Sequence, residues 1–243
     1  MSFPNIHALS GSEPYRESSV RGAIDLGAMG VMPDGRRYLW CRNGAVALAA
    51  GRVVQSELPG ANFDALVIDG AHAIGEKTIT ITNGGTAITA NMFRYGYLNV
   101  EASTGNGQLY RIASHPAADT SATCVITLET GLAVAVGASA TVTLLKHPCD
   151  SVIIHPSPPT ACVIGVPNIA VTASYYFWAQ VYGPCSVLTD GTIVAGKTVM
   201  ISDAVNGAVE PWPAGAGDDE ICVGRVMEVA ADTECSPIFL TLD

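Results

Sequence analysis

Charged side chains are scarce in this sequence. Lysine, arginine, aspartate and glutamate make up 14% of its 243 residues, whereas about 25% is usual for a soluble domain. The 22 acidic residues outnumber the 12 basic ones, which gives a net charge of -10. The basic residues are scattered and form no patch, and an acidic surface repels DNA, so the composition argues against a nucleic-acid partner. A hydrophobic fraction of 49% with so little charge suits a subunit that buries surface against other proteins.

Long apolar runs are also missing. The most apolar charge-free stretch, residues 131–145, is shorter than the ~20 residues that a membrane-spanning helix needs, and Gly137 and Ser139 interrupt it. The first 18 residues have no basic start and no apolar core, so they do not look like a secretory signal. We therefore expect no membrane partner and synthesis in a cytoplasm.

Paired cysteine motifs and nucleophile motifs are absent as well. The seven cysteines are widely spaced, with no CxxC or CxxH pair, so we expect reduced thiols and no zinc. G-x-S-x-G does not occur. The segment His147–Asp150 and the acidic run Asp218–Glu220 are most simply solvated loops rather than a Cys–His pair or a cation site. We expect no catalytic residue, no metal and no cofactor.

No helical pattern of ten or more residues is present, and the residues that remain indicate β-structure. Residues 78–82 alternate Thr and Ile, which predicts a strand with one buried face. Pro33-Asp34-Gly35 predicts a hairpin turn with a return strand over 36–41, and residues 59–67 allow one short helical turn. Many short strands separated by Gly and Asn-Gly predict an all-β fold of the β-sandwich or β-barrel type.

Composition shifts suggest how the chain is divided. Residues 1–22 are polar and predict an extended N-terminal arm, either frayed or ordered on a neighbouring subunit. We expect a β-rich domain over 23–146, a proline-rich connection over 147–161, and a C-terminal, barrel-like β-domain over 162–243. No internal repeat is obvious.

One nucleotide-binding signature is matched letter for letter. Gly191, Gly196, Lys197 and Thr198 fit G-x-x-x-x-G-K-[ST]. A phosphate-binding loop needs a helix after the lysine, but here a β-branched alternating run, Asn206-Gly207 and prolines follow. We therefore interpret the match as accidental, with two turns flanking a short strand.

Aromatic residues gather in one segment, residues 175–182. As a strand, Tyr176 and Trp178 face one way, and Tyr175 and Phe177 the other. One row is most simply core, and the other is a candidate subunit interface, where Tyr and Trp are enriched. A platform for sugars or bases is the alternative. The interface candidates are Tyr15, Tyr175, Tyr176, Phe177, Trp178, Tyr182 and Trp212.

Four segments together resemble the capsid decoration, or cement, proteins of tailed bacteriophages. They are residues 34–55 (DGRRYLWCRNGAVALAAGRVVQ), 90–117, 165–196 (beginning GVPNIAVTASYYFWAQVYG) and 223–242 (VGRVMEVAADTECSPIFLTL). The resemblance implies a β-rich protein on the outer surface of an expanded icosahedral shell. It also implies a homotrimer that bridges neighbouring major capsid proteins.

Three functions follow for testing. The leading one is a structural cement protein of the virion, with the major capsid protein and itself as partners and the outer capsid surface as its location. The alternative is a virion-surface or tail-associated module that contacts host glycans through the aromatic residues 175–182. The third, an enzyme, has the least support.

Overall fold

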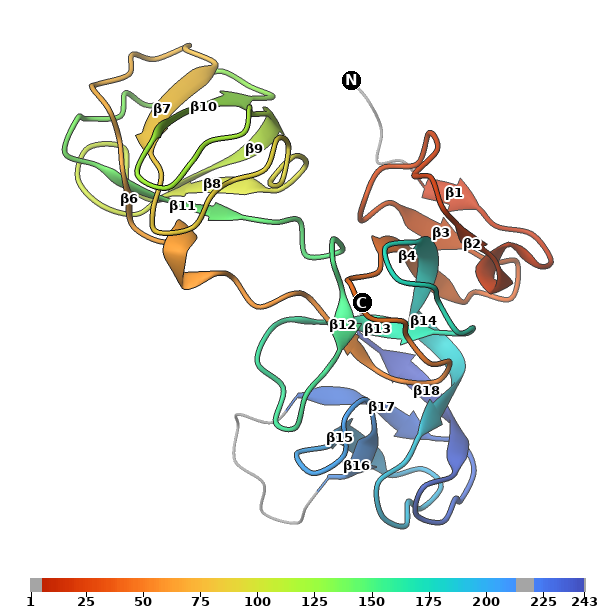
Figure 1. Ribbon diagram of the computed structural model, residues 1–243. Coiled ribbons are helices and arrows are strands. Elements are labelled where there is room, and N and C mark those ends of the chain that lie inside the picture. Colours follow the sequence, from red (N-terminus) through yellow and green to blue (C-terminus); the bar gives the residue numbers. More distant parts are fainter. Residues whose placement is uncertain (1–5, 213–220, 243) are drawn as a thin grey trace. The chain divides into compact units, whose positions relative to one another are not determined.

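The described part of this computed structural model, residues 6–212 and 221–242, is almost entirely β-structure (Figure 1). Its only helices are two 3-10 turns of three residues each, η1 (Glu13–Tyr15) and η2 (Ala61–Phe63). The predicted all-β fold is confirmed, and η2 is the short turn expected within residues 59–67. No helix of the described residues is long and apolar enough to cross a membrane.

The chain forms two compact units. Unit 1 comprises Met1–Leu58 and Pro148–Asp243, and unit 2 is the insertion Pro59–His147. This differs from the expected division into one domain over 23–146 and a second over 162–243. Strand β4 (Arg37–Arg42) pairs with β14 (Tyr176–Leu188), so early residues belong with late ones. The proline-rich segment 147–161 is not a linker between halves, because it supplies β12 (Ile153–Ile154) to unit 1.

Unit 2 is one antiparallel sheet in the order β6-β11-β8-β9-β10-β7. A bridge between Ile68 and Ile81 joins the two ends of this order, so the sheet curls back onto itself (Figure 1). One apolar cluster, which includes Ile79, Leu98 and Ile126, fills the interior. The strands are β6 (Leu66–Val67), β7 (Thr78–Thr82), β8 (Tyr97–Val100), β9 (Gln108–Ser114), β10 (Thr123–Leu128) and β11 (Thr141–Leu145).

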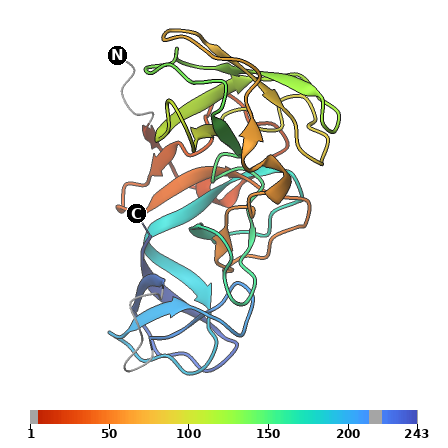
Figure 2. The ribbon, with the colours of Figure 1, turned by 90° about the vertical axis from the view of Figure 1, so that its left-hand side faces the viewer.

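Unit 1 is organised around β14, the longest strand (Figure 2). Its first half pairs with β4, and its second half pairs with β18. The main order is β1-β3-β4-β14-β18-β17-β15-β16, with β2, β5, β12 and β13 beside it. The remaining strands are β1 (Ile6–Ala8), β2 (Glu17–Ser18), β3 (Met29–Val31), β5 (Val54–Gln55), β13 (Val163–Pro167), β15 (Thr198–Ile201), β16 (Val209–Pro211), β17 (Cys222–Val226) and β18 (Cys235–Thr241).

The N-terminal segment is not an extended arm over its described part, residues 6–22. β1 pairs with β3, and β2 pairs with β14. Leu9 is buried, and the Glu17 carboxylate accepts hydrogen bonds from the Thr172 backbone N–H at 2.6 Å and its hydroxyl at 2.8 Å. The expectation of an arm that is frayed or ordered on a neighbouring subunit is therefore wrong for these residues, because two of their strands pair within unit 1 and Leu9 packs in its core. Residues 1–5 lie outside the described part.

Two local predictions are confirmed. Residues 29–31 pair with residues 37–39 around a turn in which Gly35 has φ +88°, a conformation that glycine adopts without strain. In β7 the side chains of Ile79 and Ile81 are buried, and the intervening threonines are at least partly exposed.

A loop repeat that the sequence did not reveal recurs in both units. Isolated antiparallel bridges join loops in four pairs: Leu48–Val171 and Ile193–Ala230 in unit 1, and His72–Val136 and Ile88–Ala118 in unit 2. Leu48 and Val171 exchange two N–H···O hydrogen bonds of 2.9 and 3.0 Å, and the two unit 2 pairs do likewise at 2.8–2.9 Å. The bridge residues are buried except His72, so each pair seals the core at a point where the sheet ends.

Seven of the eight paired loops have a residue with positive φ at the same distance from the bridge residue. Three residues after the bridge residue, the backbone takes a positive φ in every loop except the one that follows Val136. A strand begins within a few residues of each turn. A positive φ at the third turn position requires Gly or tolerates Asn in type II turns. The positions are Gly51, Gly75, Asn91, Ser121, Ser174, Gly196 and Thr233.

Candidate functional site

The aromatic segment predicted as an interface is β14, and its two faces enter two different cores. Phe177 and Ala179 pack in a cluster with Cys41, and Tyr176 and Trp178 pack in another with Leu9. The alternation of faces is therefore as predicted, but both rows are core. Phe177 is 0% exposed and Trp178 is 4% exposed, so neither offers surface to a partner or a sugar. The expectation that Phe177 and Trp178 are interface residues is therefore wrong.

The Trp178 face is a packed aromatic stack inside unit 1. The rings of Trp40 and Trp178 lie 4.9 Å apart at 54°, and Tyr176 stacks on Trp40 at 6.1 Å. Gly30 of β3 lies so close to this stack that a Cβ would sit 2.9 Å from Trp178 Cζ3. Position 30 therefore has no room for a side chain, and glycine lets β3 pack directly against the aromatic rings.

Five interface candidates keep exposed surface. Tyr15 is 47% exposed and accepts a hydrogen bond from Arg36 at 3.2 Å. Tyr175, Tyr176, Tyr182 and Trp212 are partly exposed. Among these, Tyr182 has the most binding-like surroundings. Its ring meets that of Phe239 edge-on at 5.2 Å, and the Arg37 guanidinium lies 4.8 Å above it.

Tyr15 also lines an open cavity in unit 1 of about 460 Å³. Arg36, Gln180, Cys185 and Cys235 share this lining. Burial raises the pKa of the Cys185 thiol to about 12, so it stays protonated and is a poor nucleophile. The Arg36 guanidinium is held by Asp34 at 2.8 Å and by Tyr15. The Cys185 thiol is thus unreactive, and the Arg36 guanidinium is engaged in structural contacts.

Gln180, also in the lining of this cavity, is fully buried, and both its amide nitrogen and its amide oxygen make hydrogen bonds. Its Nε2 donates to the carbonyl oxygens of Tyr182, Gly183 and Pro184 at 2.8–3.3 Å. Its Oε1 accepts a bond of 3.1 Å from Asn168. These bonds hold the bend at which β14 passes from β4 to β18, where Gly183 has φ +86°.

The Walker A letters fall on a paired loop and the strand after it. Gly191 and Gly196 have φ values of +77° and +79°, and Ile193 between them is a buried bridge residue. Thr198 begins β15, so a strand follows Lys197 where a phosphate-binding loop needs a helix. The predicted turns are present, and the geometry does not form a phosphate cradle.

The other chemical candidates are likewise structural where they are described. His147 stacks on Tyr97 at 5.9 Å, and the Asp150 carboxylate pairs with Arg42 at 2.5 Å. Among the described residues, no three His, Cys, Asp or Glu side chains come together as metal ligands would. The acidic run Asp218–Glu220 lies outside those residues.

The most distinctive surface feature is apolar and was missed at the sequence level. Exposed valine and isoleucine side chains lie on the paired loops, one or two residues from a bridge residue. The signal in the sequence was weak, because single exposed apolar residues are common on any surface. These residues are Val46 (74% exposed), Ile74 (69%), Val229 (60%), Val194 (52%) and Val134 (41%).

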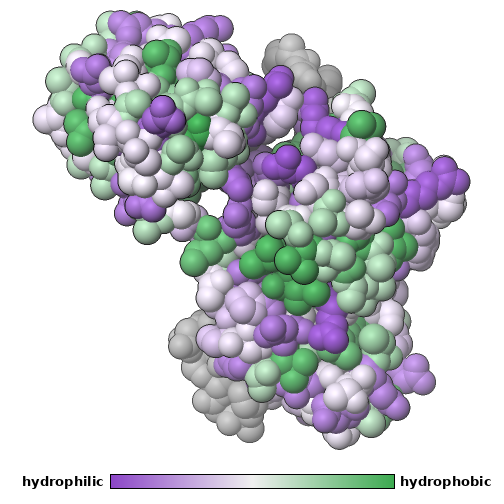
Figure 3. All heavy atoms as spheres, in the orientation of Figure 1, coloured by the Kyte–Doolittle hydropathy of each residue, from purple (hydrophilic) through white to green (hydrophobic). Residues whose placement is uncertain are grey.

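A second apolar surface belongs to unit 1 alone. Green atoms gather over the region of β12 and β13 in the space-filling view (Figure 3). Ile153, Ile154 and Val163 of these strands are partly exposed, and Leu58 is 57% exposed. Contiguous apolar surface of this kind marks a site of protein contact more often than a catalytic site.

Comparison with known proteins adds no relative. No family model, no curated protein and no solved structure matches the chain.

Proposed function

We propose that this chain is a structural protein of a phage virion that binds the outside of the expanded capsid and staples neighbouring major capsid proteins. The observation that carries the proposal is the set of exposed valine and isoleucine side chains on the paired loops of each unit, whose backbones are joined by hydrogen bonds at the bridges. Apolar side chains held on fixed backbone bind a partner with little entropic cost, as a staple requires. The resemblance of four sequence segments to decoration proteins points to the same role.

The physics of stapling is mass action. A protein that binds only the expanded shell stabilises that shell against unfolding and against the pressure of packaged DNA. Several weak contacts to different capsid subunits add up through effective concentration, so no single contact needs to be strong. The net charge of -10 keeps the protein away from DNA and suits an outward position.

The test is co-sedimentation of the purified protein with expanded shells that lack it, followed by thermal melting of the shells. We expect saturable, stoichiometric binding and a higher melting temperature. Val46→Ser with Val229→Ser in unit 1, or Ile74→Ser with Val134→Ser in unit 2, should weaken binding about tenfold or more while changing folding by no more than about 0.5 kcal/mol. Thr192→Ser, on an exposed position of a paired loop, is the matched control. A protein that never sediments with shells contradicts the proposal.

The alternative, glycan contact through residues 175–182, depends on Tyr182. Trp178 is buried, so Trp178→Ala tests folding rather than binding. Tyr182 is partly exposed, and the Phe239 ring and the Arg37 guanidinium of neighbouring strands lie beside it. Glycan binding that Tyr182→Ala abolishes, without loss of stability, would favour this role over the staple.

A further inference from the structure

Two buried cysteines of unit 1 lie together, far apart in the sequence. Cys41 is in β4, opposite Phe177 of β14. Cys149 follows Pro148, where the chain re-enters unit 1. The Arg42 N–H donates to the Cys149 carbonyl at 2.8 Å, and the Val152 N–H donates to the Arg42 carbonyl at 3.0 Å. These bonds hold segment 149–152 alongside the end of β4.

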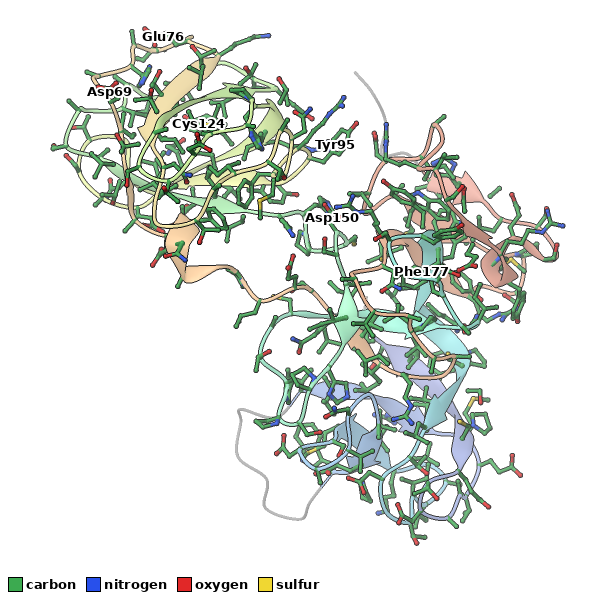
Figure 4. The ribbon with its side chains drawn as sticks, in the orientation of Figure 1. Asp69, Glu76, Tyr95, Cys124, Asp150 and Phe177 are labelled. Carbon is green, nitrogen blue, oxygen red and sulfur yellow. The ribbon has the colours of Figure 1, made fainter. Side chains whose placement is uncertain are left out.

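The side chains reinforce this register. Cys41 and Cys149 lie in the same apolar cluster with Val152 and Phe177, and the Cys149 thiol is close enough to raise the pKa of the Cys41 thiol. At the next position along, the Arg42 guanidinium meets the buried Asp150 carboxylate at 2.5 Å. Figure 4 labels Asp150 and Phe177 in this region. The two segments are therefore held together at neighbouring positions, by the Arg42–Asp150 ion pair and by the packing of Cys41 with Cys149.

The other cysteines are not placed this way. Cys185 and Cys235 line one cavity, but in the ladder of β14 and β18 Cys185 faces Ile238 and Cys235 faces Leu188. An offset of three residues along a strand is about 10 Å, which exceeds the Cα separation of a disulfide. Cys124 projects into the core of unit 2 (Figure 4), and Cys162 and Cys222 are exposed.

We propose that Cys41 and Cys149 are the site of a disulfide that forms once the protein leaves a reducing cytoplasm. This does not rest on the staple function. The oxidant is a small disulfide such as oxidised glutathione. The Cys149 thiolate attacks it, releasing one reduced glutathione, and the Cys41 thiolate then displaces the second. Two protein thiols lose two protons and two electrons, and one glutathione disulfide becomes two thiols.

The surroundings of the two cysteines lead us to expect an order for these steps and slow oxidation. Cys149 lies in an irregular segment, whereas Cys41 is in β4 and pairs with Phe177 of β14, so we expect local opening to expose Cys149 first. Burial raises the pKa of the Cys41 thiol well above its ordinary value, and the neighbouring Cys149 thiol adds to this effect. The pair is therefore slow to oxidise in the folded protein and persists once formed.

The test uses the full-length protein, incubated with oxidised or reduced glutathione in mild denaturant that permits local opening. Free thiols are then alkylated, and the digest is analysed by mass spectrometry. We expect a cross-linked peptide pair containing Cys41 and Cys149, and the loss of two of the seven free thiols. The oxidised form should melt about 5–10 °C higher, because the bond closes a loop that contains the whole of unit 2.

Variants sharpen the assignment. Cys149→Ala should abolish the cross-link and the shift in melting temperature, whereas Cys185→Ala should keep both. If a buried variant fails to fold, the wild-type peptide map still decides. Seven alkylated thiols after oxidation, or cross-links made mainly by Cys185, Cys235 or the exposed cysteines, would overturn the proposal.

Discussion

Unit 1 and unit 2 use the same paired loops but close their sheets differently. In unit 2 the bridge between Ile68 and Ile81 curls six strands around a single apolar cluster. In unit 1 the sheet has three separate apolar clusters, and β14 contributes side chains to all of them. In unit 2 the curled sheet surrounds one core. In unit 1 the long strand β14 connects three cores by contributing side chains to each.

The difference teaches where each unit is vulnerable. Unit 2 should tolerate a change in any one strand in proportion to the side chain lost. Unit 1 should be most sensitive along β14, because a change there disturbs packing on both sides of the strand. Phe177 packs on one face of β14, and Trp178 on the other.

The largest expected effect comes from emptying one core at a time. Phe177→Ala should destabilise unit 1 by about 3–5 kcal/mol, and Ile126→Ala should destabilise unit 2 by about 2–5 kcal/mol, because each leaves a cavity. Calorimetry should show two transitions, each lowered only by the variant in its own unit. Val125→Ala, beside Ile126 but 43% exposed, is the control and should change little. One common transition, shifted by both variants, would show that the units do not unfold separately.

A smaller effect tests whether the loop repeat is physical. Gly196 of unit 1 and Gly75 of unit 2 have φ values of +79° and +87°, and a Cβ on either would meet nothing within 4 Å. Gly→Ala at each should therefore cost about 1–2 kcal/mol through backbone strain alone. Thr233→Gly, in the loop bridged to that of Gly196, should be neutral or stabilising, because a β-branched residue at φ +65° is strained. The measurement is urea unfolding, with Ala195→Ser as the control. Equal effects of all four variants would contradict the repeat.

The smallest expected effect is a pH dependence of the stability of unit 2, which comes from His115. Burial lowers the pKa of His115 in unit 2 below its ordinary 6.5, although the Pro116 carbonyl, 2.9 Å from Nδ1, opposes this. Its Nε2 accepts a hydrogen bond of 2.9 Å from the Phe93 N–H, which requires an unprotonated nitrogen.

The sign of this pH dependence follows from linkage. The unfolded chain takes up a proton near pH 6.5, and the folded chain resists it. The stability of unit 2 should therefore be full above about pH 6.5 and decline as the pH falls through the folded pKa. His115→Gln keeps an acceptor but does not titrate, so its melting temperature should vary less over this range. An unchanged pH profile in the variant would assign the dependence to other groups.

Local features of this protein could be predicted because their causes are local. The Pro33-Asp34-Gly35 turn, the alternation over residues 78–82 and the two faces of β14 follow from turn chemistry and strand period. The prediction that the Walker A match is accidental was also local, since a β-branched run, Asn206-Gly207 and prolines after Lys197 leave little room for a helix.

Tertiary structure decided the rest. The pairing of β4 with β14 joins residues 37–42 to residues 176–182, and no local pattern indicates that register. The loop repeat has no simple sequence signature, because Gly, Asn, Ser and Thr all fill its positive-φ position and the bridge residues are of five different types. The burial of Trp178 and the meeting of Cys41 with Cys149 depend on segments far apart in the chain. Turns and strand faces are set by neighbouring residues, whereas pairing, burial and thiol contact are set by which distant segments pack together.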